Sequence, residues 1–455
     1  MQYSTFAAID IGSYDVILEI FEISKKQGIR SVDKICHRME LGKDTYTLGK
    51  IRPEMEEELC RVLADFVRIM EGYRVDDYRA TASSAISEAS NSLYVLGKIH
   101  QLTGLSVTVL SNSEQRFLSY KALAAMEDNF NKIIEKGTAI LDLDGGSFQI
   151  SLFDKDALVT TQNIRMGSLR IRERLAGIQS ETEHYEEMVE ELIWNEVSSF
   201  KKMYLKDRKI ENIMLIGDVF TDSVYQNIEE KTTKIISREN FNTWYEKIIR
   251  QSPMELAVKL GIPLENASLM YPSAVIYKCL IDMMGAEHIW IPGVHMTRGI
   301  AYEYAEQMKL LKGGHNFEND ILMAAKNIGK RYAVNRPHVQ NLEMTALAMF
   351  DATKKMHGMK ERERLLLQMA VMLHDVGKYI SFNNVADSSY NIIMSNEIIG
   401  LSHIEREMVA LIARYNTVTL PSYDELVMES SLSAEQYLTV SELTAIVRLA
   451  NALDR

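Results

Sequence analysis

Residues 139–153 read AILDLDGGSFQISLF, and this stretch gives the strongest indication of the fold. An apolar run ends in an acidic turn with two adjacent glycines, Gly145 and Gly146, and apolar and polar residues then alternate as in a half-buried strand. Because glycine has no Cβ, backbone N–H groups there can approach an anion. The stretch predicts a strand–turn–strand unit for a phosphate, with Asp142 and Asp144 placed to hold a divalent cation or a water.

The same pattern occurs near the N-terminus. Residues 6–13 read FAAIDIGS, an apolar strand followed by Asp10, Gly12 and Ser13. For either turn alone, a tight hairpin without any ligand is the alternative. Two such turns, each after an apolar strand, predict a duplicated domain with a phosphate site in the cleft between its halves.

Two further segments are candidates for the same site. Residues 213–218 form an apolar strand that ends in Gly217 and Asp218, a second candidate site loop. Residues 111–116 open a helix, with Ser113 as its cap and Glu114 in the first turn. A carboxylate there is favoured by the helix dipole, so Glu114 has two open roles, capping and catalysis.

The composition changes after the linker Gly313-Gly314. From about residue 320 to 455 almost every segment has helical period, which predicts a separate helical domain. A His374-Asp375 doublet with the distant His338 supplies three ligands for a divalent metal. A buried histidine that is bonded to a neighbouring carboxylate is the alternative.

Composition limits the class of protein. A net charge of −12 argues against a nucleic-acid-binding surface. The three cysteines have no metal-ligand spacing, which fits a reducing compartment. The first residues do not read as a secretion signal, and no run of about 18 apolar residues occurs. We therefore expect a cytoplasmic protein with neither membrane nor nucleic acid as a partner.

Four segments, taken in order, resemble the exopolyphosphatase and guanosine pentaphosphate phosphohydrolase (Ppx/GppA) family. They are residues 10–15, 82–91, 111–118 and 142–149. The resemblance implies two duplicated ribonuclease-H-like α/β domains, as in actin, chaperone ATPases and sugar kinases, followed by an all-α HD-like domain. The expected domains are residues 1–125, 126–312 and 313–455.

The resemblance also implies an activity. It is the hydrolysis of inorganic polyphosphate or guanosine pentaphosphate, with Mg²⁺ in the interdomain cleft and a homodimer as the analogous assembly. Asp142 with Asp10 is expected to hold the metal or the water, and Glu114 to act in catalysis. The expected phosphate-binding residues are Gly12, Ser13, Gly145, Gly146 and Ser147.

The chain departs from the family at two acidic positions. The family's catalytic base falls on Gln115, and the acidic residue that ends its central loop falls on Gln149. An amide cannot accept a proton at neutral pH. Either Glu114, Asp142 or Asp144 has taken over, or hydrolysis is weak or absent and the chain is a regulatory protein that binds a nucleotide or polyphosphate.

The helical domain shows the same mixture of retained and changed residues. By resemblance to the HD phosphohydrolases, His338 matches the first histidine and His374-Asp375 matches the doublet. The terminal aspartate of that pattern falls on Asn451, a weaker ligand. The hypotheses are a divalent metal held by the three retained residues, with a phosphomonoesterase or phosphodiesterase activity, or a structural cluster.

Overall fold

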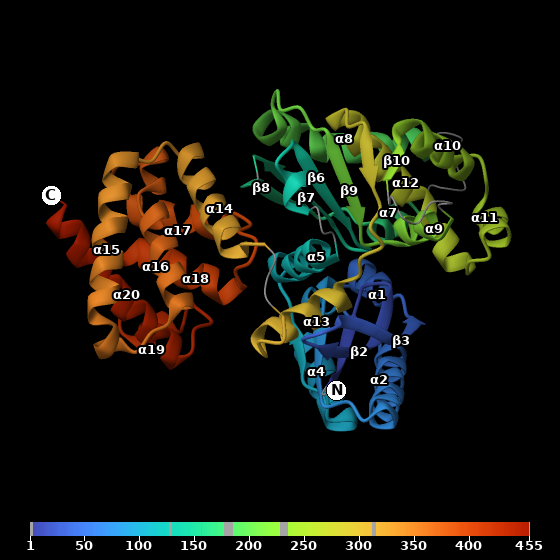
Figure 1. Cartoon of the computed structure of the whole chain (residues 1–455), viewed down its shortest axis with the longest axis horizontal. Coiled ribbons are helices and arrows are strands. Elements are labelled where there is room, and N and C mark those ends of the chain that lie inside the picture. The colour runs from blue at the N-terminus through green and yellow to red at the C-terminus, as the bar shows by residue number, and fades with distance from the viewer. Residues whose placement is uncertain are drawn as a thin grey trace. The chain divides into compact units, whose positions relative to one another are not determined.

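The computed structural model describes residues 3–126, 130–155, 157–176, 185–227, 235–311 and 315–454 (Figure 1). It divides into two compact units. The first unit comprises residues 1–156 and 161–315, and the second comprises residues 157–160 and 316–455. The first unit contains two sheets, and helices dominate the second.

The first sheet has the strand order β3-β2-β1-β4-β5. Its central strand β1 pairs antiparallel with β2 and parallel with β4, and it ends one residue after Asp10. The strands are β1 (Ser4–Ile11), β2 (Asp15–Ser24), β3 (Gly28–Arg38), β4 (Asp77–Ala82) and β5 (Val107–Val109).

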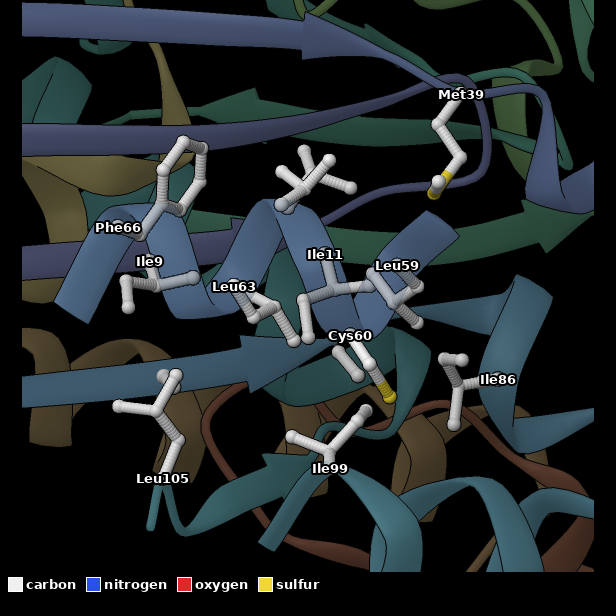
Figure 2. Close-up of a cluster of buried hydrophobic side chains, with 14 of the residues drawn as sticks. Ile9, Ile11, Met39, Leu59, Cys60, Leu63, Phe66, Ile86, Ile99 and Leu105 are labelled. Carbon is white, nitrogen blue, oxygen red and sulfur yellow. The ribbon is translucent and has the colours of Figure 1, made fainter. Parts of the chain in front are cut away.

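Successive side chains of β1 point to opposite faces of this sheet, and a separate hydrophobic core packs on each face. Ile9 and Ile11 point toward Leu63 and Phe66 of α2 (Pro53–Tyr73) and form one buried cluster with them (Figure 2). The other helices of this part are α1 (Leu41–Leu48), α3 (Ser84–Ser87), α4 (Ser92–Thr103) and α5 (Asn112–Met126).

The second sheet repeats the arrangement of the first. Read as β8-β7-β6-β9-β11-β10, it again places an antiparallel hairpin, β6 and β7, beside a parallel strand, β9. The strands are β6 (Thr138–Leu143), β7 (Phe148–Asp154), β8 (Ala157–Ile164), β9 (Asn212–Ile216), β10 (Ile235–Ser237) and β11 (His288–Trp290). The helices are α6 (Phe130–Ile134), α7 (Ser168–Leu175), α8 (Tyr185–Phe200), η1 (Lys201–Leu205), α9 (Val219–Asn227), α10 (Arg238–Ile249), α11 (Pro253–Leu260) and α12 (Leu264–Met284).

One helix crosses back to the first sheet. Helix α13 (Met296–Gln307) packs against β1 and α5, and its Tyr304 ring stacks on Phe6 with centroids 4.1 Å apart. The core of the first sheet therefore includes a segment from within residues 126–312. The predicted domain boundaries remain a prediction. They assign α13 to the second domain, although this helix packs on the first sheet.

Apart from residues 157–160, which belong to β8, the second unit is built from helices. These are α14 (Phe317–Arg331), α15 (Arg336–His357), α16 (Glu361–Leu373), η2 (Val376–Tyr379), α17 (Val385–Ser395), α18 (His403–Tyr415), α19 (Tyr423–Leu426) and α20 (Ala434–Leu453). Two α/β sheets followed by a helical region confirm the predicted fold class at that level. Within the described ranges, no helix has both the length and the apolar character needed to cross a membrane.

Candidate functional site

The two acidic turns line one cavity of about 410 Å³ in the first unit. Asp10 comes from the end of β1, Asp142 from β6, and Asp144 from the turn that follows β6. Asp218 joins them because β9 is parallel to β6 and pairs Ile216 with Asp142, so the next two residues continue at the same sheet edge. The predicted shared cleft is therefore present.

Asp142 is held by a buried ion pair. Arg116 of α5 donates from Nη1 to Asp142 Oδ1 at 2.8 Å, and the two residues are only 3% and 4% exposed. Burial raises the pKa of Asp142, and the Arg116 charge opposes that rise. Arg116 also donates to Ser147 Oγ at 3.2 Å. The guanidinium thus fixes both the carboxylate and the turn that follows it.

Three cleft carboxylates each have one buried oxygen without a hydrogen-bond partner. These atoms are Oδ1 of Asp10, Oδ2 of Asp142 and Oδ2 of Asp218. Burial raises the pKa of Asp10 well above its usual range and raises the pKa of Asp218 to about 7. Carboxylate oxygens are ligands that Mg²⁺ prefers, so each of these aspartates offers one ligand, although within the described residues the three do not form a group with all ligand atoms within 4.8 Å of one another.

The two amides lie beside aspartates. Gln115 is 7% exposed and donates from Nε2 to Asp144 Oδ2 at 3.4 Å. Gln149 pairs with Asp142 across β6 and β7, and its Oε1 is buried without a partner. The carboxylate in contact with the position of the family's base is therefore that of Asp144.

Glu114 is not brought to these aspartates. Its Oε2 accepts from the backbone N–H of Ser111 at 2.9 Å and from Ser111 Oγ at 2.7 Å. The Glu114 N–H donates back to Ser111 Oγ at 3.3 Å, which completes a capping box at the start of α5. The cap is therefore Ser111 and not Ser113, which lies inside the helix. Its side chain lines a different hollow, together with Asp77 and Glu303. Of the two roles that the sequence left open, the geometry is that of a cap.

The predicted phosphate-binding residues divide into two groups. Gly12 and Gly145 line the cavity. The described lining of that cavity does not include Ser13, Gly146 or Ser147. Ser13 is fully buried and Ser147 is bonded to Arg116, so their hydroxyls already have protein partners.

Sequence reasoning missed the cations of the cleft. Lys34 and Arg38 of β3 line the cavity with Cys36 between them. The spacing of two residues places all three on one face of a strand, and this period was the signal available in the sequence. Arg38 Nη1 also donates to Asn266 Oδ1, which accepts from Tyr14 Oη at 2.7 Å.

The second unit has a cavity of its own, of about 380 Å³, which brings His338, His374 and Asp375 together. One ligand atom from each lies within 4.8 Å of the others. His374 Nδ1 lies 2.7 Å from the carbonyl oxygen of Val371, which assigns the ring proton to Nδ1 and leaves Nε2 bare. Burial lowers the pKa of His374, which favours this neutral form.

The second imidazole is oriented by an aspartate that the sequence reasoning missed. His338 Nδ1 lies 2.5 Å from Asp454 Oδ2, and the Nε2 atoms of His338 and His374 face each other at 3.3 Å. Asn451, the position expected for the last carboxylate, donates instead to Asn416 Oδ1 at 3.3 Å. Asp454 lies three residues further along the chain, at the C-cap of α20, and that spacing was a usable signal.

Comparisons with known proteins agree with the fold. The model of the Ppx/GppA phosphatase family matches residues 20–308, and that of Ppx/GppA phosphatase, domain III, matches residues 322–455. A bifunctional 3-dehydroquinate synthase/phosphatase of Fusobacterium nucleatum is 21% identical over 310 residues, which is 62% of this chain and 44% of that protein. A guanosine-5'-triphosphate,3'-diphosphate pyrophosphatase of Vibrio atlanticus is 18% identical over 449 residues, which is 97% of this chain and 86% of that protein.

Solved structures support the same architecture. The crystal structure of the Aquifex aeolicus member of the Ppx/GppA family matches with a TM-score of 0.56 and 18% identity, covering 68% of this chain and 99% of that one. An exopolyphosphatase from Cytophaga hutchinsonii matches with a TM-score of 0.59 and 17% identity, covering 67% and 98%. At these identities the likeness concerns the fold.

Proposed function

This chain belongs to the Ppx/GppA phosphatase family, and we propose that it releases the terminal phosphate of inorganic polyphosphate or guanosine pentaphosphate by water attack on phosphorus. The observation that carries the proposal is the cavity in which both acidic turns meet, with buried carboxylate oxygens that have no partner. The relatives named as a pyrophosphatase and an exopolyphosphatase support this substrate class.

Asp10 and Asp142 are the residues that we propose hold Mg²⁺. Each offers one buried oxygen without a hydrogen-bond partner, and the second oxygen of Asp142 is fixed by Arg116. When bound, Mg²⁺ would neutralise phosphate oxygens and lower the pKa of an attacking water. The cations Lys34 and Arg38 on the wall of the cleft would attract and orient the polyanion.

Asp144, rather than Glu114, is the base that we propose. Its carboxylate contacts Gln115, where the family's glutamate would stand, whereas Glu114 is engaged in the capping box. Asp144 Oδ1 accepts the N–H of Gly145 at 2.5 Å, which holds the carboxylate at the glycine turn. Oδ2 is then the oxygen oriented to take a proton from water.

Phosphate release from long-chain polyphosphate and from guanosine pentaphosphate, with and without Mg²⁺, tests the proposal. We expect Mg²⁺-dependent release that falls by about 10²–10⁴ in Asp144→Asn and in the isosteric Asp142→Asn. Asp77→Asn, an exposed aspartate beside Glu114, is the matched control and should stay within about threefold of wild type. Release that is independent of Mg²⁺, or equal in all four proteins, would reject the assignment.

A second activity is proposed for the helical unit, as a metal-dependent phosphoesterase of the HD-like type. The observation that favours it is the pair of Nε2 atoms 3.3 Å apart, each on a ring whose Nδ1 is bonded elsewhere. Two facing lone pairs repel unless a proton or a metal lies between them, and Asp375 adds a carboxylate. Stoichiometric Mn, Fe or Zn that is lost in His374→Ala, together with phosphoesterase activity on a generic aryl phosphate, would support it; a metal-free protein would remove it.

A further inference from the structure

We propose that Tyr46 fills a phosphate-binding subsite of the α/β cleft and thereby limits how many phosphates of a substrate the cleft can hold. The inference rests on the proposed phosphoanhydride substrate. It adds a residue that determines specificity and that none of the sequence motifs contains.

The Tyr46 hydroxyl occupies the place of a phosphate oxygen. Tyr46 belongs to α1, and its Oη lies 2.7 Å from Ser13 Oγ and 2.9 Å from Ser84 Oγ. The two serine hydroxyls are 3.2 Å apart, so the three oxygens form a closed triangle. Ser13 of the first acidic turn is 0% exposed and Ser84 at the start of α3 is 5% exposed, so both hydroxyls are turned toward the phenol instead of the cavity.

The glycine turn presses against the same hydroxyl. A Cβ added to Gly146 would lie 2.2 Å from Tyr46 Oη and 2.6 Å from Ser84 Oγ. A Cβ added to Gly42 would lie 2.6 Å from the Tyr46 ring. The backbone approaches the phenol as closely as a glycine turn approaches a phosphate, which requires glycine for the same steric reason.

A positive charge stands beside the subsite. The Arg170 guanidinium lies 3.8 Å from the centroid of the Tyr46 ring. Its Nε donates to the Gly146 carbonyl oxygen at 2.9 Å, and its Nη2 donates to Glu88 at 3.0 Å. Two hydroxyls, a glycine turn and a guanidinium are the groups that bind a phosphate, and here a neutral phenol holds them together.

The consequence concerns the substrate. Gly12 and Gly145 still line the open cavity, whereas Ser13 and Gly146 face the phenol, so only part of the predicted phosphate cradle is available. Burial raises the pKa of Tyr46 to about 12, so the group that fills the subsite is uncharged at neutral pH. A smaller side chain at this position would open the subsite to another phosphate.

Binding of inorganic tripolyphosphate without metal, measured by calorimetry, tests the proposal. We expect Tyr46→Ala to bind at least about tenfold more tightly than wild type, because two hydroxyls gain a charged acceptor. Tyr46→Phe keeps the ring and should bind as wild type does. The double variant Tyr46→Ala/Ser84→Ala should lose the gain, and Tyr73→Ala, which removes a tyrosine ring at the end of α2, controls for the loss of an aromatic side chain.

Each outcome of the binding experiment either supports or overturns the proposed role of Tyr46. Unchanged affinity in a folded Tyr46→Ala protein would overturn the proposal, and so would an equal gain in Tyr46→Phe, because the block would then not be the ring. If Tyr46→Ala fails to fold, Tyr46→Leu, which keeps apolar volume without reaching the serines, takes its place with the same expected gain. Because the readout is binding, an inactive wild-type enzyme would reject the proposed function without deciding this inference.

Discussion

The cleft of the α/β unit and the cavity of the helical unit arrange their possible cation ligands differently. In the cleft the aspartates are spread over three strand ends, and each of three carboxylates keeps one unpaired oxygen. Within the described residues, three possible ligands whose atoms lie within 4.8 Å of one another occur instead in the helical cavity. They are His338, His374 and Asp375.

From this difference we infer which of the two proposed metal sites needs a substrate. Mg²⁺ is usually held by one or two carboxylates together with substrate phosphates, so scattered aspartates suit a metal that arrives with the polyanion. The helical site has imidazoles whose outer nitrogens are already fixed by Asp454 and Val371, the arrangement that orients ligands before a metal binds. We therefore expect the cleft to need its substrate and the helical cavity to bind metal alone.

The largest expected effect is a charge swap in the cleft. Asp144→Asn should lower the rate of phosphate release by about 10²–10⁴. Adding Gln115→Glu should restore a large part of that rate, because it places a carboxylate at residue 115, on the other side of the contact with residue 144. Gln115→Glu alone places two carboxylates against each other, which raises the pKa of one, so it should not increase the rate at neutral pH. If steady-state kinetics show no rescue of the rate in the double variant, Asp144 is not the general base.

The helical cavity is the next test of the comparison. Asp454→Asn should weaken Mn²⁺ binding by about 10–100-fold, because His338 loses the carboxylate that orients it. Asn451→Ala, on the same helix, and Asp142→Asn, in the cleft, are the controls and should leave the affinity unchanged. Calorimetric titration of the metal-free protein measures all three; equal losses would mean that the two sites are not independent.

The pH dependence of stability tests the burial of one cleft aspartate, Asp218. The pKa of Asp218 is about 7 instead of 3.8, so the folded state binds its proton more tightly than the unfolded state does. The stabilisation is complete below about pH 4 and is lost as the pH rises toward 7. A shift of about 3 pKa units corresponds to about 4 kcal/mol, so Asp218→Asn should raise the free energy of unfolding at pH 8 by up to about 4 kcal/mol relative to wild type, and by much less at pH 4.

Thermal unfolding at the two pH values without divalent ions measures the difference, with the exposed Asp65→Asn as control. A stabilisation of equal size at both pH values would show that the buried charge is not the cause. Added Mg²⁺ should reduce the gain if the cleft carboxylates hold the ion.

The smallest expected effect concerns Glu114. Glu114→Ala removes the acceptor of the capping box and should cost about 1 kcal/mol of unfolding free energy, while phosphate release stays within about threefold. Glu114→Gln keeps an acceptor and should lose less stability. A hundredfold loss of activity in either variant would return Glu114 to the chemistry and weaken the case for Asp144.

Much of the architecture was readable from local pattern. The alternation after Asp142 and the apolar run before Asp10 predicted two hairpins, and both form with the acidic residue at the strand end. The helical period after residue 320 predicted the helical region. These elements were predicted from apolar residues that recur every two residues in a strand and every 3.6 residues in a helix, and such periods are visible in a short stretch of sequence.

Local geometry is therefore encoded in short stretches of the chain: two acidic glycine turns, a histidine–aspartate doublet and the helices that follow it. Which of these groups come into contact depends on how the elements pack in three dimensions. The tertiary structure places Glu114 in a cap and Asp144 against Gln115, Asp454 instead of Asn451 against His338, and the phenol of Tyr46 between two serines. Except for the cap, these contacts join residues 29 to 116 positions apart, and such contacts depend on how sheets and helices pack, which no short period in the sequence encodes.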